Sequence, residues 1–141
     1  MKIINKIGLV ILVSVMCVPA SAGVVVVAHP SASDSAIIKA VVKRIFLGRM
    51  KEFPSGNPLV AVEQSSESPS MVEFHNKVTK KTPKGLHSYW VKVVTSGKGV
   101  KLRSLPGDAE VKSWVASHPE GLGYIDASNV DDSVKVVYTL R

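Results

Sequence analysis

Four polar side chains that can hold an anion fall within seven residues in the middle of the chain: Gln64, Ser66, Ser68 and Ser70. Serine hydroxyls and a glutamine amide are hydrogen-bond donors. Pro69 suits the first position of a helix, because that position needs no N–H partner. With Ser68 as the N-cap, free amides and the positive end of the helix dipole would converge on the hydroxyls. The pattern favours an anion-binding turn, and the alternative is a turn that only caps the helix.

No other group of residues predicts catalysis or metal binding. The four histidines lack the spacing of a metal motif such as H-E-x-x-H, so we expect them to be solvated or to cap helices. The neighbouring Asp131 and Asp132 suit a solvated turn better than a catalytic pair. A serine turn without an acid and a histidine in its pattern does not predict a hydrolase. We therefore predict no catalytic residue, no metal site and no cofactor.

The segments on either side of the serine turn can position it. Small apolar residues alternate over 59–63, as in a strand that leaves a core. After the turn, Met71, Phe74 and Val78 recur at the spacing of one helix face. The turn is therefore predicted to join a strand to the N-terminus of an amphipathic helix.

The remainder of the chain alternates strands and helices. A run of β-branched residues over 23–28 is typical of a strand buried on both faces, which favours a sheet covered by helices. Apolar residues at helical spacing over 37–45 predict a helix that Ser33 or Asp34 caps and that Gly48 ends. Further segments are predicted as a helix or extended chain over 86–94, a helix over 106–118, and strands over 122–126 and 134–138. The predicted fold class is α/β, with a mixed sheet flanked by helices.

The first residues have the pattern of a targeting segment. Two lysines precede an apolar run over 7–18, and the chain then reaches Ala20-Ser21-Ala22, the small-x-small pattern that signal peptidase cleaves. We expect residues 1–22 to be a cleaved signal peptide and residues 23–141 to form one domain in the periplasm. Cys17 leaves with the signal peptide, so the mature chain has no thiol for a disulfide or a thiolate metal site.

The chain is basic. Its formal net charge is +7, and removal of Lys2 and Lys6 with the signal peptide leaves +5. A basic exported domain suits an anionic small molecule, an acidic partner or a bacterial envelope surface. The basic residues are scattered along the sequence and export removes the usual target, so nucleic-acid binding is not predicted. The apolar run is too short to span a bilayer comfortably, so we expect no stable membrane insertion after cleavage.

Several short motifs occur in a fixed order: Ile45-Phe46-Leu47-Gly48-Arg49, the serine turn, Phe74, Tyr89-Trp90 and Gly121-Leu122-Gly123-Tyr124-Ile125. Together they resemble the periplasmic phosphate-binding proteins of ABC importers, and specifically their short single-lobe relatives. The resemblance covers residues 24–137. It implies a single lobe of a type II periplasmic-binding-protein fold and an exported solute-binding protein for phosphate or another oxyanion. An ABC permease or a second-lobe protein would be its partner.

The resemblance also assigns a ligand turn. The family has a Ser-Gly-Thr turn preceded by an arginine; here the turn aligns as Ser68-Pro69-Ser70, and Gln64 stands at the position of the arginine. Proline removes one backbone donor, and glutamine removes a bidentate charged contact. Glu63 and Glu67 flank the turn and would repel a dianion. Two functions stay open: a solute-binding protein that holds phosphate through the polar turn residues, and a single-lobe interaction module that binds a protein partner or itself in the periplasm without a role in transport.

Overall fold

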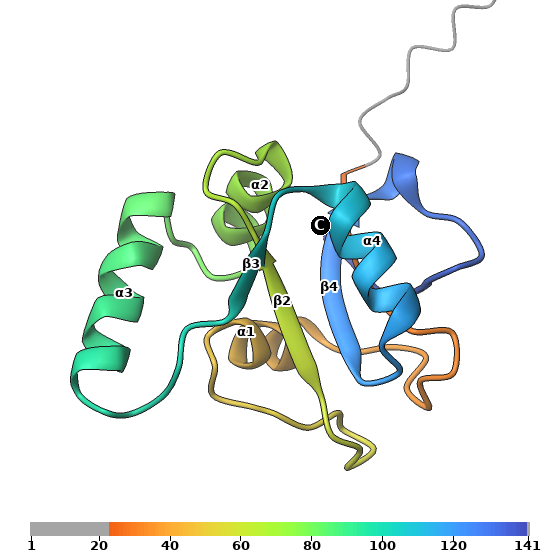
Figure 1. Cartoon of the computed structure of the whole chain (residues 1–141), viewed down its shortest axis with the longest axis horizontal. Helices are drawn as coiled ribbons and strands as arrows, with labels where there is room; N and C mark the ends of the chain where they lie inside the picture. Colours follow the sequence, from red (N-terminus) through yellow and green to blue (C-terminus); the bar gives the residue numbers. More distant parts are fainter. Residues whose placement is uncertain (1–22, 141) are drawn as a thin grey trace, which may run out of the picture.

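The computed structural model describes residues 23–140, which are built around one five-stranded mixed sheet (Figure 1). The strands are β1 (Val24–Ala28), β2 (Val60–Gln64), β3 (Arg103–Leu105), β4 (Gly121–Asp126) and β5 (Lys135–Thr139). The helices are α1 (Lys39–Phe46), α2 (Pro69–Lys77), α3 (Pro83–Thr95) and α4 (Asp108–Ser117), with a short 3-10 helix η1 (Ala127–Asn129). The predicted α/β class with a mixed sheet flanked by helices is confirmed. The predicted signal peptide lies outside the described residues.

The sheet has the strand order β3-β2-β4-β1-β5. Strand β2 is parallel to both β3 and β4, whereas β1 is antiparallel to both β4 and β5. All five residues of β1 are buried, as its run of valines predicts. Val24 and Val26 face a core formed with α1, α2 and α3, while Val25 and Val27 face a second core formed with α4. Helices therefore cover both faces of the sheet.

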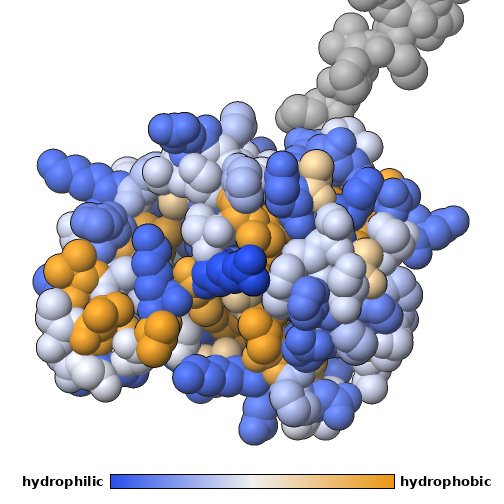
Figure 2. Space-filling view, in the orientation of Figure 1, coloured by the Kyte–Doolittle hydropathy of each residue, from blue (hydrophilic) through white to orange (hydrophobic). Residues whose placement is uncertain are grey.

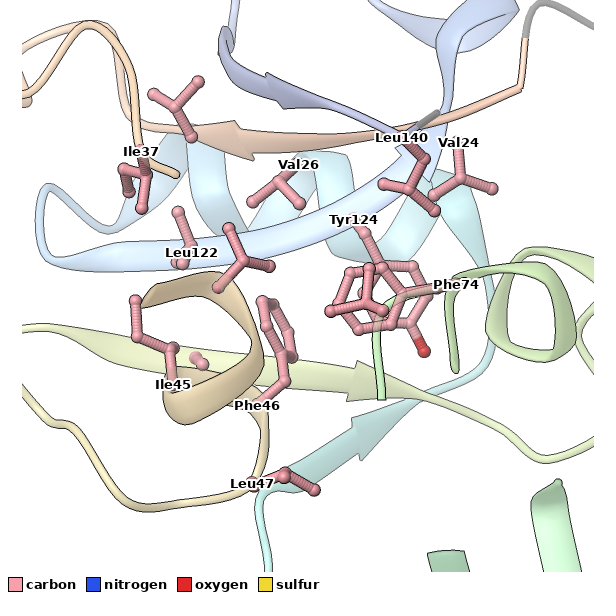
Figure 3. Close-up of a cluster of buried hydrophobic side chains, with 14 of the residues drawn as sticks. Val24, Val26, Ile37, Ile45, Phe46, Leu47, Phe74, Leu122, Tyr124 and Leu140 are labelled. Carbon is pink, nitrogen blue, oxygen red and sulfur yellow. The ribbon is translucent and has the colours of Figure 1, made fainter. Parts of the chain in front are cut away.

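Three aromatic rings join α1, α2 and β4 in the larger core (Figure 3). The rings of Phe74 and Tyr124 are stacked, with centroids 4.1 Å apart and planes 5° from parallel. The ring of Phe46 meets that of Phe74 edge-on at 4.7 Å. Aromatic pairs in such geometries add to the free energy gained by burial alone. The helix that follows the serine turn is thereby held against the middle of the sheet.

Two glycines of β4 allow α4 to approach the sheet closely. A Cβ atom on Gly123 would lie 2.5 Å from Cγ1 of Val111, and a Cβ atom on Gly121 would lie 2.7 Å from the ring of Trp114. Real Cβ atoms do not come so near, so a larger residue would push the helix away. The motif Gly121-Leu122-Gly123 is therefore a packing requirement of the α4–β4 contact.

The start of α1 differs from the prediction. The helix begins at Lys39, and its N-cap is Ile38, which makes no side-chain capping bond, so the predicted caps Ser33 and Asp34 are wrong. The amide of Ile37 donates to the carbonyl of Val137 on β5 at 2.8 Å, which holds this residue in an extended segment before the helix. The predicted end is confirmed, because Gly48 follows the C-cap with a φ of 71° that favours glycine.

The other predictions agree with the structure, with one omission. The segment over 86–94, left open between helix and extended chain, lies within α3, and the helix predicted over 106–118 is α4. Strand β3 was not predicted. It has only three residues, none of them buried, and therefore carries no hydrophobic pattern.

The described residues form two clusters of buried apolar side chains, one on each face of the sheet. Within the described part of the chain, no helix has the length and apolar character needed to cross a membrane. Residues 23–141, the mature chain that the sequence predicts, contain both clusters and are the chain used in the measurements proposed below.

The close approach of α4 predicts a cost for any side chain at position 123. We expect Gly123→Ala to lower the free energy of unfolding by about 1–3 kcal/mol, because the new methyl group overpacks the contact with Val111. The measurement is urea unfolding of residues 23–141. The double variant Gly123→Ala, Val111→Ala serves as a control, since removing the facing side chain relieves the clash. Strictly additive costs would contradict the steric explanation.

Candidate functional site

The turn between β2 and α2 has the predicted backbone. Ser68 is the N-cap of α2, and Pro69 stands at its first position, so this part of the prediction is confirmed. The amide of Ser68 donates to the backbone carbonyl of Ser65 at 2.9 Å, and the amide of Val72 donates to the backbone carbonyl of Ser68 at 3.2 Å. Among the described residues, no acceptor is bonded to the amides of Ser70 and Met71. These two amides are the free backbone donors at the helix N-terminus.

The side chain of Gln64 is buried and fully used inside the protein. Its Nε2 donates to Oδ1 of Asp108 at 2.8 Å and to the carbonyl of Tyr124 at 2.7 Å, while its Oε1 accepts the hydroxyl of Ser68. The Ser68 side chain consequently makes no capping bond to α2. Gln64 and Ser68 form a tie between β2, α2 and α4, and the structure leaves neither side chain a spare proton for a ligand.

Asp108, the first residue of α4, supplies an internal carboxylate at the turn. Besides Gln64, its donors are the amide of Asp126 at 3.1 Å and Nδ2 of Asn129 at 2.9 Å. Burial by itself raises the pKa of this carboxyl, but hydrogen bonds from Gln64, Asp126, Ser70 and Asn129 outweigh it, so the pKa lies below the ordinary 3.8. Asp108 is therefore ionised at neutral pH and occupies donors that an external anion would need.

The predicted residues are divided between two pockets rather than brought together in one. Ser68 and Ser70 line a pocket of about 590 Å³ beside α4, which we call the α4-side pocket. Three carboxylates line it as well, those of Glu67, Asp108 and Asp126. An anion in this pocket would meet like charges at close range.

Gln64 and Ser66 line a separate pocket of about 480 Å³ beside α3, the α3-side pocket. Lys84 and Lys101 lie on its wall, and its floor includes the buried apolar side chains Met71, Leu86 and Trp90. Neither lysine takes part in an ion pair among residues 23–140. The serine turn thus has an acidic side and a basic side.

The only acid on the wall of the α3-side pocket, Glu63, is directed into the core. Its Oε1 contacts Nε2 of His75, and its Oε2 accepts the hydroxyl of Tyr124 at 2.5 Å. Nδ1 of His75 lies 2.8 Å from the hydroxyl of Thr79. Burial raises the pKa of the Tyr124 phenol, and the charge of Glu63 raises it further, so the phenol keeps its proton and donates.

Two predictions are therefore wrong. His75 is completely buried and paired with Glu63, whereas a solvated or capping role was predicted for it. Glu63 does not project into the turn to repel an anion, because its carboxylate is buried between His75 and Tyr124. A signal for the pair exists in the sequence: Glu63 occupies the inward-facing register of an apolar strand, a position that a carboxylate takes only with a buried partner.

The other histidine and acidic residues of the described part of the chain do not form a metal site. Among the described residues, no group of three or more His, Cys, Asp or Glu side chains is placed to hold a metal ion. Asp131 accepts Nζ of Lys112 at 2.8 Å in an exposed ion pair, and His118 contacts the carbonyl of Trp114 at the end of α4.

Part of each of three solved proteins has the fold of this chain. A proposed phosphate ABC transporter substrate-binding protein from Clostridium perfringens, with bound phosphate, matches with a TM-score of 0.66 and 23% identity, over 82% of this chain and 44% of its own. An ABC-type phosphate transport receptor from Vibrio cholerae matches with a TM-score of 0.64 and 14% identity, over 82% and 45%. PstS from Borrelia burgdorferi matches with 0.62 and 13%, over 82% and 46%. No family model matches the sequence, and no curated protein does.

The chain has the fold of one lobe of these proteins. The resemblance read from the motifs and the predicted single lobe of a type II periplasmic-binding-protein fold are thereby confirmed at the level of the fold. The chain spans less than half the length of each of these three proteins. The first two are a substrate-binding protein and a transport receptor.

The low pKa of Asp108 predicts a pH dependence of stability. Because the folded pKa lies below 3.8, ionised Asp108 stabilises the fold above that pH, and this contribution is lost as the pH falls through the folded pKa. We expect Asp108→Asn to flatten the fall in unfolding free energy between about pH 5 and about pH 2. Urea unfolding across this range measures it. Glu67→Gln, which changes an exposed acid of the same turn, is the control; an equal flattening there would contradict the assignment.

The buried pair predicts a large loss of stability when one partner is removed. We expect Glu63→Leu to cost about 3–5 kcal/mol, because His75 and the Tyr124 hydroxyl would stay buried without their acceptor. The matched control is Glu67→Leu, for which we expect a change within about 0.5 kcal/mol because the site is exposed. Urea unfolding of both variants decides the point. Similar costs for the two would show that the pair does not stabilise the fold.

Proposed function

We propose that this chain is an exported binding protein, without catalytic activity, that holds phosphate or a similar small oxyanion at the turn between β2 and α2. Its fold is that of substrate-binding proteins, and the turn joins a strand to a helix N-terminus with two free amides. The observation that carries the proposal is the α3-side pocket, where the hydroxyl-bearing Ser66 lies with Lys84 and Lys101.

The α3-side pocket is the better anion site for an electrostatic reason. Its two lysines have no acidic partner among the described residues, and its one acid, Glu63, has both carboxylate oxygens engaged in the core. The α4-side pocket contains three carboxylates, which disfavour a dianion there. Of the four predicted ligand residues, Ser66 is the one with a hydroxyl on the basic side. Gln64 then acts by holding the turn rather than by touching the anion.

A single lobe leaves one side of the anion open to water. Ser66, Lys84 and Lys101 are exposed, so a ligand bound to them keeps part of its hydration and each contact is screened by salt. We expect weak binding by the isolated chain. A second-lobe protein or an ABC permease that covers the turn would supply the missing contacts.

A second candidate function is the single-lobe interaction module. It is favoured by the internal use of two side chains of the turn: Gln64 binds both Ser68 and Asp108, so neither Gln64 nor Ser68 needs a ligand. In that case the turn would be a structural tie, and a protein partner or a second copy would bind elsewhere on the domain.

Calorimetric titration of residues 23–141 with inorganic phosphate at low salt separates the two functions. We expect Lys84→Gln, Lys101→Gln to abolish the heat of binding, while Lys39→Gln, Lys112→Gln, with the same change of charge away from the pocket, retains it. We expect Ser68→Ala, Ser70→Ala to have a small effect, since these side chains lie on the acidic side.

Two results would contradict the proposal in different ways. Absence of heat at millimolar phosphate for the unaltered domain would favour the interaction module. Loss of binding in the Ser68→Ala, Ser70→Ala variant alone would move the anion to the α4-side pocket. In the latter case Asp108→Asn should strengthen binding, because it removes one of the three like charges that line the pocket.

A further inference from the structure

The basic residues are concentrated in one part of the chain. Residues 74–107 contain no aspartate or glutamate. They contain eight lysines and arginines: Lys77, Lys80, Lys81, Lys84, Lys92, Lys98, Lys101 and Arg103. This stretch comprises the C-terminal part of α2 and all of α3 and β3, and α3 stands at one edge of the domain (Figure 1). Among the described residues only Lys77 of this set pairs with an acid, Glu73. The interpretation of the basic residues as scattered is therefore wrong for this flank.

Exposed apolar side chains lie among these lysines. Helix α3 packs on the core through Leu86 and Trp90, yet Val91 and Val94 on the same helix are 47% and 50% exposed. Val100, in the segment after the helix, is 80% exposed. Figure 2 shows hydrophobic side chains gathered over the region of α3, with hydrophilic ones between them. We call Val91, Lys92, Val94, Lys98 and Val100 the α3 surface.

A groove beside the α3 surface has the same character. Its volume is about 450 Å³, and Leu47, Val93 and the ring of Tyr89 contribute to its wall. Its charged lining residues are all basic: Arg49, Lys92 and Lys98. The Tyr89 hydroxyl donates to the carbonyl of Leu47 at 2.6 Å, which fixes the ring at the junction of α1 and α3. The groove thus combines an apolar wall with a cationic rim.

We propose that the α3 surface docks the domain on a lipid bilayer that contains anionic phospholipid. Lysines near such a bilayer are attracted to its headgroups, and apolar side chains between them can enter the boundary of the acyl chains. A soluble polyanion would use the lysines but not the exposed valines, and an uncharged apolar partner would use the valines but not the lysines. The combination favours a charged bilayer. Docking is peripheral, since no described helix can cross a membrane.

This inference goes beyond the proposed anion site and does not depend on it. The anion site uses Lys84, at the start of α3, and Lys101, whereas docking uses the second half of the helix and the residues that follow. Variants of Lys92 and Lys98 therefore test docking, and variants of Lys84 and Lys101 test phosphate binding. Either proposal can fail while the other stands.

The test is co-sedimentation of residues 23–141 with vesicles, which leaves out residues 1–22 because their apolar run would itself partition into lipid. We expect binding to vesicles of phosphatidylcholine and phosphatidylglycerol in equal parts, and none to phosphatidylcholine alone. Each lysine near the surface contributes about a fivefold increase in partitioning, so Lys92→Gln, Lys98→Gln should lower it about 25-fold. Val91→Ser, Val94→Ser should lower it severalfold without changing the net charge.

The control is Lys39→Gln, Lys112→Gln, which removes the same charge from α1 and α4 and should bind vesicles nearly as the unaltered domain does. Circular dichroism checks that every variant is folded. Absence of binding to the anionic vesicles would overturn the proposal. So would equal weakening by the two lysine pairs, which would indicate only net charge. Unchanged binding in the valine variant would also overturn bilayer docking and point to a soluble polyanion.

Discussion

The buried interaction of Glu63 with His75 and Tyr124 is the constraint on which the arrangement of the turn depends. A carboxylate in a protein core is tolerated only when its oxygens are satisfied, and here one oxygen meets the imidazole on α2 and the other the phenol on β4. Because β2, α2 and β4 each contribute one of the three residues, these contacts fix the position of α2 relative to the sheet. The stacked rings of Phe74 and Tyr124 add a second contact between α2 and β4.

Two consecutive residues of β2, Glu63 and Gln64, connect the turn to the helices on its two sides. Side chains alternate along a strand, so Glu63 enters the core beside α2 while Gln64 points to the opposite face and reaches Asp108 at the start of α4. The glycines of β4 bring α4 close enough for this contact. A turn of serines is thereby set between two helices, with a carboxylate on one side and lysines on the other.

The sequence predicts what depends on neighbours along the chain, and it fails where partners come from distant elements. The valine run, the end of α1 at Gly48 and the start of α2 at Ser68 and Pro69 follow from local patterns, and all three are present. The predicted caps of α1, Ser33 and Asp34, were wrong because the hydrogen bond from the amide of Ile37 to β5 keeps that residue extended, so the helix begins later in the chain. No local pattern contains this contact. In the site, the position of the turn was predictable. The strand register carries a signal for the burial of Glu63, but the pairing of His75 and the role of Asp108 were not predictable, since each depends on a side chain from another element.

The basic and acidic residues are concentrated in different parts of the chain, so the domain has a basic side and an acidic side. Residues 74–107 contain eight basic and no acidic residues, whereas residues 108–134 contain six acidic residues and one lysine. The first stretch forms the flank that carries α3, and the second contains α4, β4 and η1. The serine turn lies at the boundary, which is why its two pockets have opposite character. An approaching anion, whether a small oxyanion or a charged bilayer, is attracted to the α3 flank and repelled from the α4 flank, and this attraction weakens as salt is added. The same uneven distribution of charge therefore turns the α3 flank of the domain toward both of the proposed ligands, the small oxyanion and the anionic bilayer.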